Sequence, residues 1–576
     1  MAMRALLCLL LLGLAACSAR EPIVYSGPEP APVKFGRVPP PGAYAPSFDV
    51  LHYNIDLDLT RATEQAGDSA MVSGIATLLV VVEDAREDSI RLDLSGMRAV
   101  RVDIGKLRAE PHSVEFRQED GRLFALLDEG IRSGDTIRVV VQYDGRPDDG
   151  LIIRRNVHGQ LGAFADNWPD RARFWFPAID HPSDKATVEF SVRAPAGWEV
   201  IANGTRVQDS TSSGAWRYRL SRPVPTYLMV VGATDFAIGT VAPCANGGRA
   251  PHHANGCVPV TYWVFPQDSA NGARIFRRGA QMVEYYSQLI APFPYERLAH
   301  VQSSTIFGGM ENATAIFYSE QAIRNGTLSE GTVSHEVAHQ WFGDAVTPGH
   351  WSDLWLSEGF ATYFGNLFFE QADGIERFRS GIRDSWNGYL RSDVTDLAIV
   401  DTVKVPGDDL TKLLNRNSYN KGGAVLHMLR GVLGDDVFFR GIRRYYGRHA
   451  HGNARTPDFR RAMEEESGRE LGWFFDQWLY RPGHPILRVS HSWDSAAGEA
   501  VVTLEQVQKS EWPTFRMPVT FEFSTERGAI RSTVQMVGRR EVYRLRLPAA
   551  PTAVRIDPDG WVLHEMAPET ASGRGS

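Results

Sequence analysis

Apolar and polar residues alternate in short runs over the first part of the chain. From residue 53 to 59 the sequence YNIDLDL changes character at every step, as on a strand with one buried face. Similar runs recur to about residue 239, separated by Gly, Pro and Asp: ATLLVVV, IRLDL, TIRVVVQY, TVEFSV and YLMVVG. This pattern predicts an all-β N-terminal domain over residues 46–265.

Helical spacing replaces this alternation in the middle of the chain. In ARIFRRGAQMVEYYSQLI and PDFRRAMEEESGRELGWFFDQWL, apolar residues return every three or four positions. A mainly helical domain is therefore expected over residues 266–483. Strand-like runs such as ILRVSHSW, AVVTLEQV and PVTFEFS then predict a small C-terminal β domain over residues 484–567. The expected fold class is multidomain α+β, with a β-sandwich or saddle domain first and a small β-sandwich last.

Two segments near the ends of the chain show neither the alternation of a strand nor the spacing of a helix. Residues 18–45 are rich in Pro and Gly and are expected to form an extended tether. The last residues, 568–576, read PETASGRGS and are expected to be disordered.

Composition places the chain among soluble multidomain proteins. It has 576 residues, of which 43% are hydrophobic and 23% charged, and a net charge of −8. No basic tract suited to phosphates occurs, so nucleic acid is not expected as a partner. The sequence leaves the oligomeric state open.

The first residues resemble an export signal. Arg4 precedes an apolar run at residues 5–12 that is too short to span a bilayer. The run leads into Leu-Ala-Ala-Cys ending at Cys17, which resembles the lipobox of bacterial lipoproteins. This resemblance implies a signal peptide over residues 1–17, a lipid anchor on Cys17 and, because Ser18 follows, attachment to the outer membrane facing the periplasm. A plain cleaved signal with a chance cysteine is the alternative.

A second pair of cysteines flanks a Gly- and Asn-rich loop. Cys244 and Cys257 are 13 positions apart. Because the chain is expected to be exported, a disulfide between them is predicted. His252 and His253 lie within the same loop, which leaves a second metal site as an alternative.

The strongest chemical signal lies in the helical block. His335 and His339 are four residues apart and can point two imidazoles at one ion from one helix face. Glu336 lies one step round the helix, within reach of a water on that ion. A third ligand is available at Glu358, within WSDLWLSEGFATYF. Two His and one carboxylate leave the fourth position open, as a catalytic zinc site requires. The alternative, hydrogen-bonded core histidines, would bury polar groups at a cost.

Three motifs together resemble the zinc aminopeptidases of the aminopeptidase N type, a group of gluzincin metallopeptidases. The first is HEVAHQWFGD followed by WSDLWLSEGFA, and the resemblance covers about residues 45–567. The other two are Gly308-Gly309-Met310-Glu311-Asn312 and Tyr419-Asn420-Lys421-Gly422.

The resemblance implies roles for the central residues. The middle domain would be thermolysin-like, with one Zn²⁺ per chain held by His335, His339 and Glu358. Glu336 would act as the general base. Tyr419 corresponds to the family tyrosine that hydrogen-bonds the oxyanion formed during attack.

The Gly308–Asn312 motif implies an exopeptidase. Glu311 would pair with the free α-ammonium of a peptide and so fix the scissile bond one residue from the N-terminus. Gly308 and Gly309 would let the backbone approach the peptide closely. Met310 and Asn312 complete the motif, and all five are predicted to bind substrate.

The sequence departs from the family in two respects. Family members carry Gln or Glu before a segment that here reads FPAIDHP. By counting back, Asp166 and Trp168 take these positions, and Asp166 is a candidate to replace the lost amine ligand. Many relatives also continue into a large helical domain, whereas this sequence ends after a small β domain, so a more open cleft is expected.

The leading interpretation is a zinc aminopeptidase that hydrolyses the N-terminal bond of peptides with a free amine. A zinc endopeptidase is one alternative, although Glu311 would leave little room upstream of the scissile bond. A non-catalytic peptide-binding protein on the same fold is another. Epoxide hydrolysis is a weaker option suggested by the second Gly of GGMEN. The preferred N-terminal residue is left open.

Overall fold

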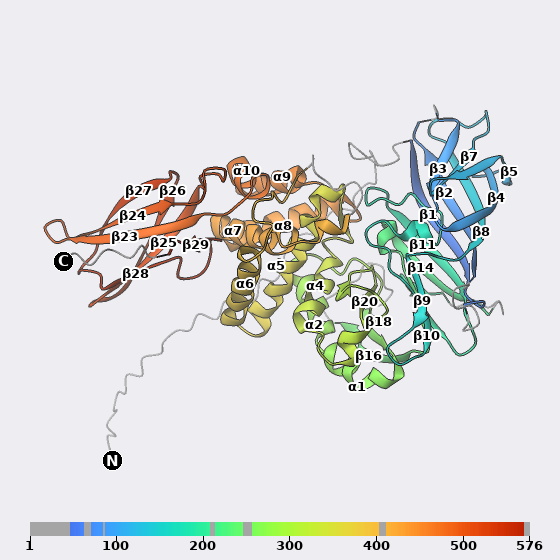
Figure 1. The fold of residues 1–576 in the computed structure, drawn as a ribbon, viewed down its shortest axis with the longest axis horizontal. Helices are drawn as coiled ribbons and strands as arrows, with labels where there is room; N and C mark the ends of the chain where they lie inside the picture. The colour runs from blue at the N-terminus through green and yellow to red at the C-terminus, as the bar shows by residue number, and fades with distance from the viewer. Residues whose placement is uncertain are drawn as a thin grey trace, which may run out of the picture.

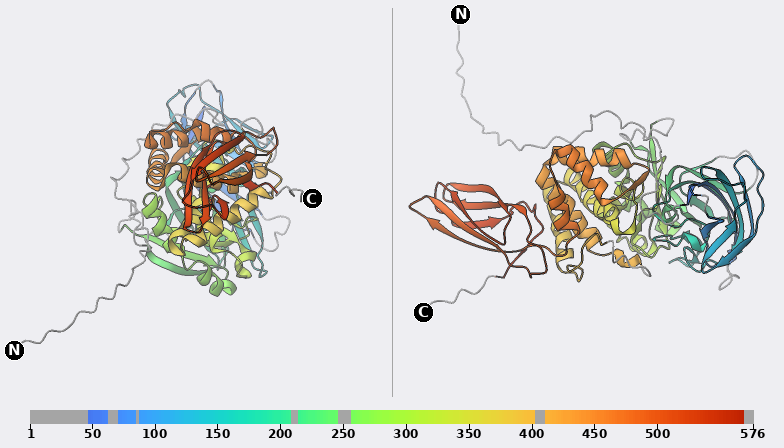
Figure 2. Two further views of the ribbon diagram at one scale, coloured as in Figure 1. Left: turned by 90° about the vertical axis from the view of Figure 1, so that its left-hand side faces the viewer. Right: turned by 90° about the horizontal axis from the view of Figure 1, so that it is seen from above.

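The computed structural model arranges the chain as three bodies in a row. A β-rich body, a mainly helical body and a second β body follow one another along the long axis (Figures 1 and 2). The predicted fold class is confirmed. The structure describes residues 47–62, 71–84, 87–207, 214–245, 256–401 and 410–568. Cys17, the predicted tether and the histidines at 252 and 253 lie outside these ranges.

The N-terminal body is built on an eight-stranded sheet. Its central strand β1 pairs parallel with β11 and antiparallel with β2, and the predicted alternation places residues such as Tyr53, Ile55 and Leu57 in the core. In order across the sheet the strands are β13 (Thr205–Arg206), β14 (Trp216–Val224), β11 (Ala186–Arg193), β1 (Phe48–Asp58), β2 (Val72–Val82), β8 (Thr136–Gly145), β4 (Met97–Lys106) and β5 (His112–Ser113).

Two smaller sheets complete this body. One contains β12 (Glu199–Ala202), β15 (Val231–Thr234), β10 (Leu161–Ala165) and β9 (Leu151–Arg155). The other contains β3 (Ser89–Asp93), β7 (Arg122–Leu126) and β6 (Phe116–Glu119). Phe164 of β10 packs edge-on against Phe317 of the middle body, with ring centroids 6.0 Å apart, so the four-stranded sheet faces the middle body.

The middle body begins with a five-stranded sheet. Its strands, in order, are β16 (Ala237–Ala245), β17 (Val258–Val264), β18 (Leu298–Ser303), β20 (Ala315–Ser319) and β19 (Gly309–Met310). Cys244 of β16 forms a disulfide with Cys257. The predicted boundary at residue 265 is therefore wrong, because β17 pairs with β18 and both early strands belong to the middle body. Alternation identifies a strand, but it does not say which sheet the strand joins.

Helices surround the metal-ligand segments. They are α1 (Ser269–Ile275), α2 (Gly279–Leu289), α3 (Glu320–Arg324), α4 (Glu330–His339), α5 (Trp355–Ala372), α6 (Ile375–Leu390), α7 (Gly422–Leu433), α8 (Asp435–His449), α9 (Thr456–Ser467) and α10 (Gly472–Leu479). Short elements between them are β21 (Val346–Pro348), β22 (Gly452–Ala454), the 3₁₀ turns at Trp351–Asp353 and Leu410–Leu413, and a π-helix at Asn417–Lys421.

Local sequence explains where α4 begins and why α5 is buried. The hydroxyl of Ser329 accepts a hydrogen bond from the backbone N–H of Thr332, which caps α4, and Glu330 follows in the first turn. α5 is apolar nearly all round, which is typical of a helix in the interior of a domain. In the part of the chain that the structure describes, no helix combines the length and apolar character needed to cross a bilayer.

The C-terminal body is a β-sandwich of two sheets whose strand pairs are mostly antiparallel. Phe521 and Phe523 of one sheet and Val502 and Leu504 of the other are buried in its core. One sheet contains β27 (Arg540–Arg546), β24 (Glu499–Gln506), β23 (Ile486–Asp494) and β29 (Glu565–Met566); the other contains β26 (Gly528–Met536), β25 (Met517–Thr525) and β28 (Ala553–Ile556).

Buried polar contacts fasten the bodies together. The ammonium of Lys185 donates to the backbone carbonyls of Asp344, Ala345 and Gly452 at 2.9–3.1 Å. These carbonyls lie just beyond α4 and in β22, so the N-terminal body is pinned close to the metal-ligand helix. Charge-assisted bonds of this kind are stronger than neutral ones, and leaving such carbonyls unpaired would be costly.

Candidate active site

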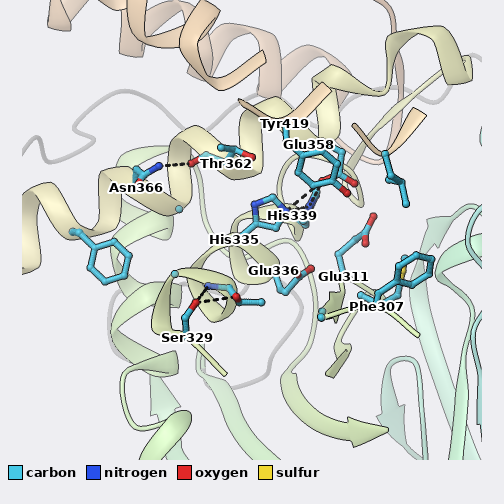
Figure 3. Close-up of a pocket in the computed structure, with 18 of the residues that line it drawn as sticks. Phe307, Glu311, Ser329, His335, Glu336, His339, Glu358, Thr362, Asn366 and Tyr419 are labelled. Atoms are coloured by element: carbon cyan, nitrogen blue, oxygen red, sulfur yellow. Dashed lines mark hydrogen bonds and ion pairs between the residues drawn. The ribbon is translucent and has the colours of Figure 1, made fainter. Parts of the chain in front are cut away.

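The packing of α4 against α5 brings the three predicted metal ligands together. His335 and His339 project from α4, and Glu358 projects from the first turn of α5 (Figure 3). The Nε2 atoms of the two histidines are 3.0 Å apart, and the Oε2 of Glu358 lies 3.3 Å from each of them. His339 and Glu358 are buried, and His335 keeps a small exposed surface.

Hydrogen bonds fix the orientation of one imidazole. Nδ1 of His339 lies 3.0 Å from the carbonyl oxygen of Phe342 and 3.1 Å from the hydroxyl of Ser357. A carbonyl can only accept, so the proton is on Nδ1 and the lone pair on Nε2 points toward His335 and Glu358. Electron-pair donors from three side chains thus converge on one point. This donor set, two imidazole nitrogens and one carboxylate oxygen, fits a divalent cation such as zinc.

The charges of the buried cluster also call for a cation. Burial acts to lower the pKa of His339, but the carboxylates of Glu311 and Glu358 outweigh it and raise this pKa to about 10. Burial acts to raise the pKa of Glu358, but His339 outweighs it and lowers this pKa to about 2. The buried carboxylates therefore favour a positive charge at this point, and a metal ion bound there would supply that charge and leave Nε2 of His339 as an unprotonated donor.

Two further carboxylates border the ligand cluster. Glu311, Glu336 and His339 offer atoms that all lie within 4.8 Å of one another. Burial raises the pKa of Glu311 to about 7 and raises that of Glu336 well above its usual range. Gly309 lies against Glu336, and a Cβ built on it would be 2.7 Å from Cγ of Glu336. The lack of a side chain at Gly309 therefore leaves room for this carboxylate.

A glutamine next to the histidine motif positions Glu311. The side-chain amide of Gln340 donates to the backbone carbonyl of Glu311 at 2.8 Å, and its oxygen accepts from the backbone N–H of Thr314 at 2.9 Å. The same amide reaches the carboxylate of Asp344 at 2.7 Å. Gln340 thus ties the segment that carries Glu311 to the end of α4.

Tyr419 lies beside the ligands on the π-helix that precedes α7. Its ring stacks on that of His335, with centroids 5.9 Å apart and planes 13° apart. Burial, together with Glu358 and Glu311, raises the pKa of Tyr419 well above its usual value, so the phenol stays protonated and can donate a hydrogen bond. π-Helical turns occur often at functional sites.

A close approach of two helices sets the position of Tyr419. A Cβ on Gly359 of α5 would lie 2.9 Å from Cα of Gly422 in α7, and the reverse distance is 3.0 Å. Only two glycines permit this contact. Since Gly359 follows Glu358 directly and Gly422 lies three residues after Tyr419, the contact brings the tyrosine to the ligand helix.

The cluster opens into a cavity of about 490 Å³. In Figure 3, Phe307 and Glu311 lie at one end of it, and Ser329 and Asn366 lie on the far side of the histidines. The lining residues are Trp168, Phe307, Gly308, Gly309, Met310, Glu311, Ser329, Gly331, Thr332, His335, Glu336, His339, Glu358, Thr362, Gly365, Asn366, Phe369, Arg377, Leu414 and Tyr419.

Two predicted substrate-binding residues lie outside this cavity. Asp166 is buried, pairs with Arg171 at 3.1 Å and accepts hydrogen bonds from Thr305 and from the backbone N–H of Ile306. The prediction that it replaces the family's amine ligand is wrong, because its carboxylate is used to hold the loop before Phe307. Asn312 is fully buried and does not line the cavity either. Both were assigned from sequence position, which does not give side-chain direction.

Other cavity residues were missed by sequence reasoning. Trp168, which takes the place of a family Gln or Glu, packs edge-on against Phe307 with centroids 6.0 Å apart and forms an apolar wall. Thr362 and Asn366 lie four and eight positions after Glu358 on α5, a helical spacing that could have pointed to them. Arg377 on α6 had no motif to mark it.

Comparisons with known proteins agree with this geometry. The model of the peptidase family M1 domain matches residues 276–478, and that of the peptidase M1 N-terminal domain matches residues 50–228. A leucyl aminopeptidase from Saccharolobus solfataricus is 25% identical over 76% of this chain and 55% of its own length. An aminopeptidase N from Streptomyces lividans is 30% identical over 56% of this chain and 38% of its own. The chain thus spans about half the length, or less, of these curated relatives.

A solved structure is similar along nearly all of its own length. The M1 zinc metallopeptidase from Deinococcus radiodurans has a TM-score of 0.63 and 26% identity to this chain. The similarity covers 75% of this chain and 93% of that one.

Metal binding gives the first prediction. In a titration with Zn²⁺, the wild-type chain is expected to bind one ion. Glu358→Gln should weaken the affinity for Zn²⁺ by more than about 100-fold, because the loss of a residue that only hydrogen-bonds to a metal ligand already costs about 10- to 100-fold. Competition with a chromophoric chelator measures this. Glu376→Gln on α6, whose side chain is 73% exposed, is the matched control and should bind like the wild type. Equal affinity in Glu358→Gln would refute the ligand assignment.

Proposed function

The chain belongs to peptidase family M1, and we propose that it is a zinc-dependent aminopeptidase that removes residues from the N-terminus of peptides. The observation that carries this proposal is the buried carboxylate of Glu311 beside the ligand cluster, in the wall of a cavity of about 490 Å³. The names of the relatives and of the structural neighbour agree with it.

His335, His339 and Glu358 would hold the zinc ion. A zinc ion held there supplies a Lewis acid that polarises the scissile carbonyl and lowers the pKa of the attacking water. The hydrogen bond from Nδ1 of His339 to the Phe342 carbonyl keeps the imidazole in the tautomer that such an ion needs.

Glu336 is suited to the role of general base. Its carboxylate is buried beside His339 and faces the cavity, and its raised pKa makes it a good proton acceptor. In the proposed reaction Glu336 takes a proton from the attacking water and then gives it to the amine that leaves when the C–N bond breaks. Gly309 keeps the space around this carboxylate free.

Tyr419 and Glu311 would act on opposite parts of the substrate. The protonated phenol of Tyr419 can donate to the oxygen of the scissile carbonyl as negative charge develops there. Glu311 can pair with the peptide's α-ammonium, which places the first peptide bond at the metal. An endopeptidase would need open space where Glu311 lies, because its substrate continues upstream of the scissile bond. A non-catalytic peptide-binding protein would not require Glu336 and Tyr419 in addition to the three metal ligands.

We further propose that the mature protein is exported and anchored to the outer membrane through a lipid on Cys17. The support is the apolar run ending in Leu-Ala-Ala-Cys and the serine that follows it. An acyl chain adds about 0.8 kcal/mol of membrane affinity for each buried CH₂, so a multiply acylated cysteine holds a protein stably.

A substrate assay tests the catalytic proposal. The full chain should hydrolyse aminoacyl-arylamides and free-amine peptides but not matched N-acetylated peptides. Glu336→Gln should lower kcat by about 10²- to 10⁴-fold, since it removes the base, and Glu311→Ala should chiefly weaken use of the free-amine substrates. Liquid chromatography of the released amino acid provides the measurement. Cleavage of acetylated peptides would make the protein an endopeptidase, and no cleavage of either with zinc bound would make it a binding protein.

A substitution at Gly309 tests the role of Glu336 as general base without removing the carboxyl group of Glu336. Gly309→Ala is expected to displace Glu336 and to lower kcat by about 100-fold, within the contribution of a general base, while zinc affinity is retained. Gly130→Ala, in the N-terminal body, is the control because a Cβ there also meets no atom within 4 Å, and it should keep the wild-type activity. Similar losses in both variants would contradict the role given to Gly309.

The anchor is tested by labelling. In a Gram-negative host grown with a labelled fatty acid, the wild-type chain should carry the label and fractionate with the outer membrane, whereas Cys17→Ala should carry none. Cys8→Ala alters the other cysteine of the N-terminal segment and should be labelled normally. Label on Cys17→Ala, or none on the wild type, would reject the anchor.

A further inference from the structure

The charges of the catalytic cavity are separated along its length. Glu311, Glu336 and Glu358 surround the histidine pair at one end. Among the described residues that line the cavity, Arg377 is the one Lys or Arg. The cavity therefore has a carboxylate for a substrate ammonium near the metal cluster and a cation elsewhere in its wall.

An aromatic ring supports the guanidinium of Arg377. Its Cζ lies 4.8 Å from the ring centroid of Phe369, and both side chains line the cavity. A guanidinium over an aromatic face gains cation–π attraction and keeps its planar set of N–H donors free for a ligand. Arg377 is exposed, so a substrate in the cavity can reach it.

The acidic residues nearest to Arg377 in the sequence pair with other arginines. No ion pair of Arg377 with a carboxylate occurs in the described residues, so its charge remains available. These pairs are Asp373 with Arg278 and Glu376 with Arg379. Glu330, which is distant in the sequence, pairs with Arg277 and Arg278.

Helix geometry gives the length of α5 between Glu358, one of the metal ligands, and Phe369, which contacts Arg377. Glu358, Thr362, Gly365, Asn366 and Phe369 follow one another on α5 at helical spacing, and all of them line the cavity. Phe369 is eleven positions beyond Glu358. At about 1.5 Å per residue, this corresponds to about 16 Å along the helix axis.

We propose that Arg377 binds the α-carboxylate of short peptides, so that the preferred substrates are zwitterionic oligopeptides with about four or five residues beyond the scissile bond. An extended peptide covers about 3.3–3.6 Å per residue, which over about 16 Å gives this length. The inference rests on the proposed aminopeptidase activity and names the substrate class of the same cavity. A planar guanidinium suits a carboxylate because it can bind both oxygens at once.

The wall between the two ends fits a peptide backbone. Thr362, Asn366, Ser329 and Thr332 carry uncharged polar groups along the cavity. They offer hydrogen bonds without a preference for charge. Selection by net charge therefore falls on the ends of the substrate, its ammonium at Glu311 and its carboxylate at Arg377.

A length series of matched peptides tests this assignment. Leu-(Ala)n peptides with n from 1 to 9, each as the free acid and as the C-terminal amide, are hydrolysed by the full chain, and kcat/KM for release of leucine is measured. For the wild type, kcat/KM of the acids should peak at about n = 4 or 5, where the acid should exceed the amide by about fivefold or more. Because the contact is exposed, this ratio should shrink at high salt.

Variants of Arg377 locate the cause. Arg377→Gln should bring the acid-to-amide ratio close to one at every length, and Arg377→Lys should restore part of it. Arg379→Gln, on the same helix but outside the cavity, is the matched control and should keep the wild-type ratio. A wild-type ratio of one at all lengths, or an unchanged ratio in Arg377→Gln, would overturn the proposal.

The same series separates failure of this inference from failure of the proposed function. Leucine arylamide has no C-terminal carboxylate and reports the metal site and its base. If the wild type fails to cleave it and every Leu peptide, the aminopeptidase proposal is refuted and the inference falls with it. If the arylamide and the peptides are cleaved but acids and amides do not differ, only the role of Arg377 is refuted.

Discussion

Two imidazole nitrogens and a carboxylate oxygen, held within 3.0–3.3 Å of one another in the interior, impose the constraint on which the rest of the site depends. Such electron-pair donors repel one another unless a positive charge lies among them, and burial removes the water that would otherwise screen them. The packing of α4 on α5 is therefore coupled to the binding of a cation. His339 shows the coupling most clearly, because a backbone carbonyl at one ring nitrogen commits the other to the cluster.

The charge of the cluster also orders the rest of the cleft. Three carboxylates near one end favour a substrate ammonium, and the arginine supported by Phe369 favours a carboxylate at a distance set by α5. Polar but uncharged side chains such as Thr362 lie between them. A peptide in its zwitterionic form matches this order in one direction only. Under the proposed function, this charge placement would set the direction in which a peptide lies in the cleft.

Side chains of the N-terminal body form part of the rim of the cavity. Asp166 holds the loop that presents Phe307, Trp168 supplies an apolar wall, and Lys185 ties the body to carbonyls that follow α4. None of these side chains is positioned by its own strand or helix alone. The contacts cross from one body to the other, so the rim of the cavity depends on how the bodies dock, whereas the metal cluster depends on two helices of one body.

The sequence by itself determined which residues could act as metal ligands and base, and which segments form strands. Histidines four apart share a helix face, the glutamate between them must lie beside that face, and alternation marks strands, since each of these follows from a local period of the backbone. Only the tertiary structure decided which partner each face meets. It assigned β16 and β17 to the middle sheet, used Asp166 for support, brought Gly359 against Gly422 beside Tyr419, and set Arg377 over Phe369 in the cavity. A local period fixes the direction of a side chain relative to its own element, but contacts between distant elements depend on packing that no short stretch of sequence contains.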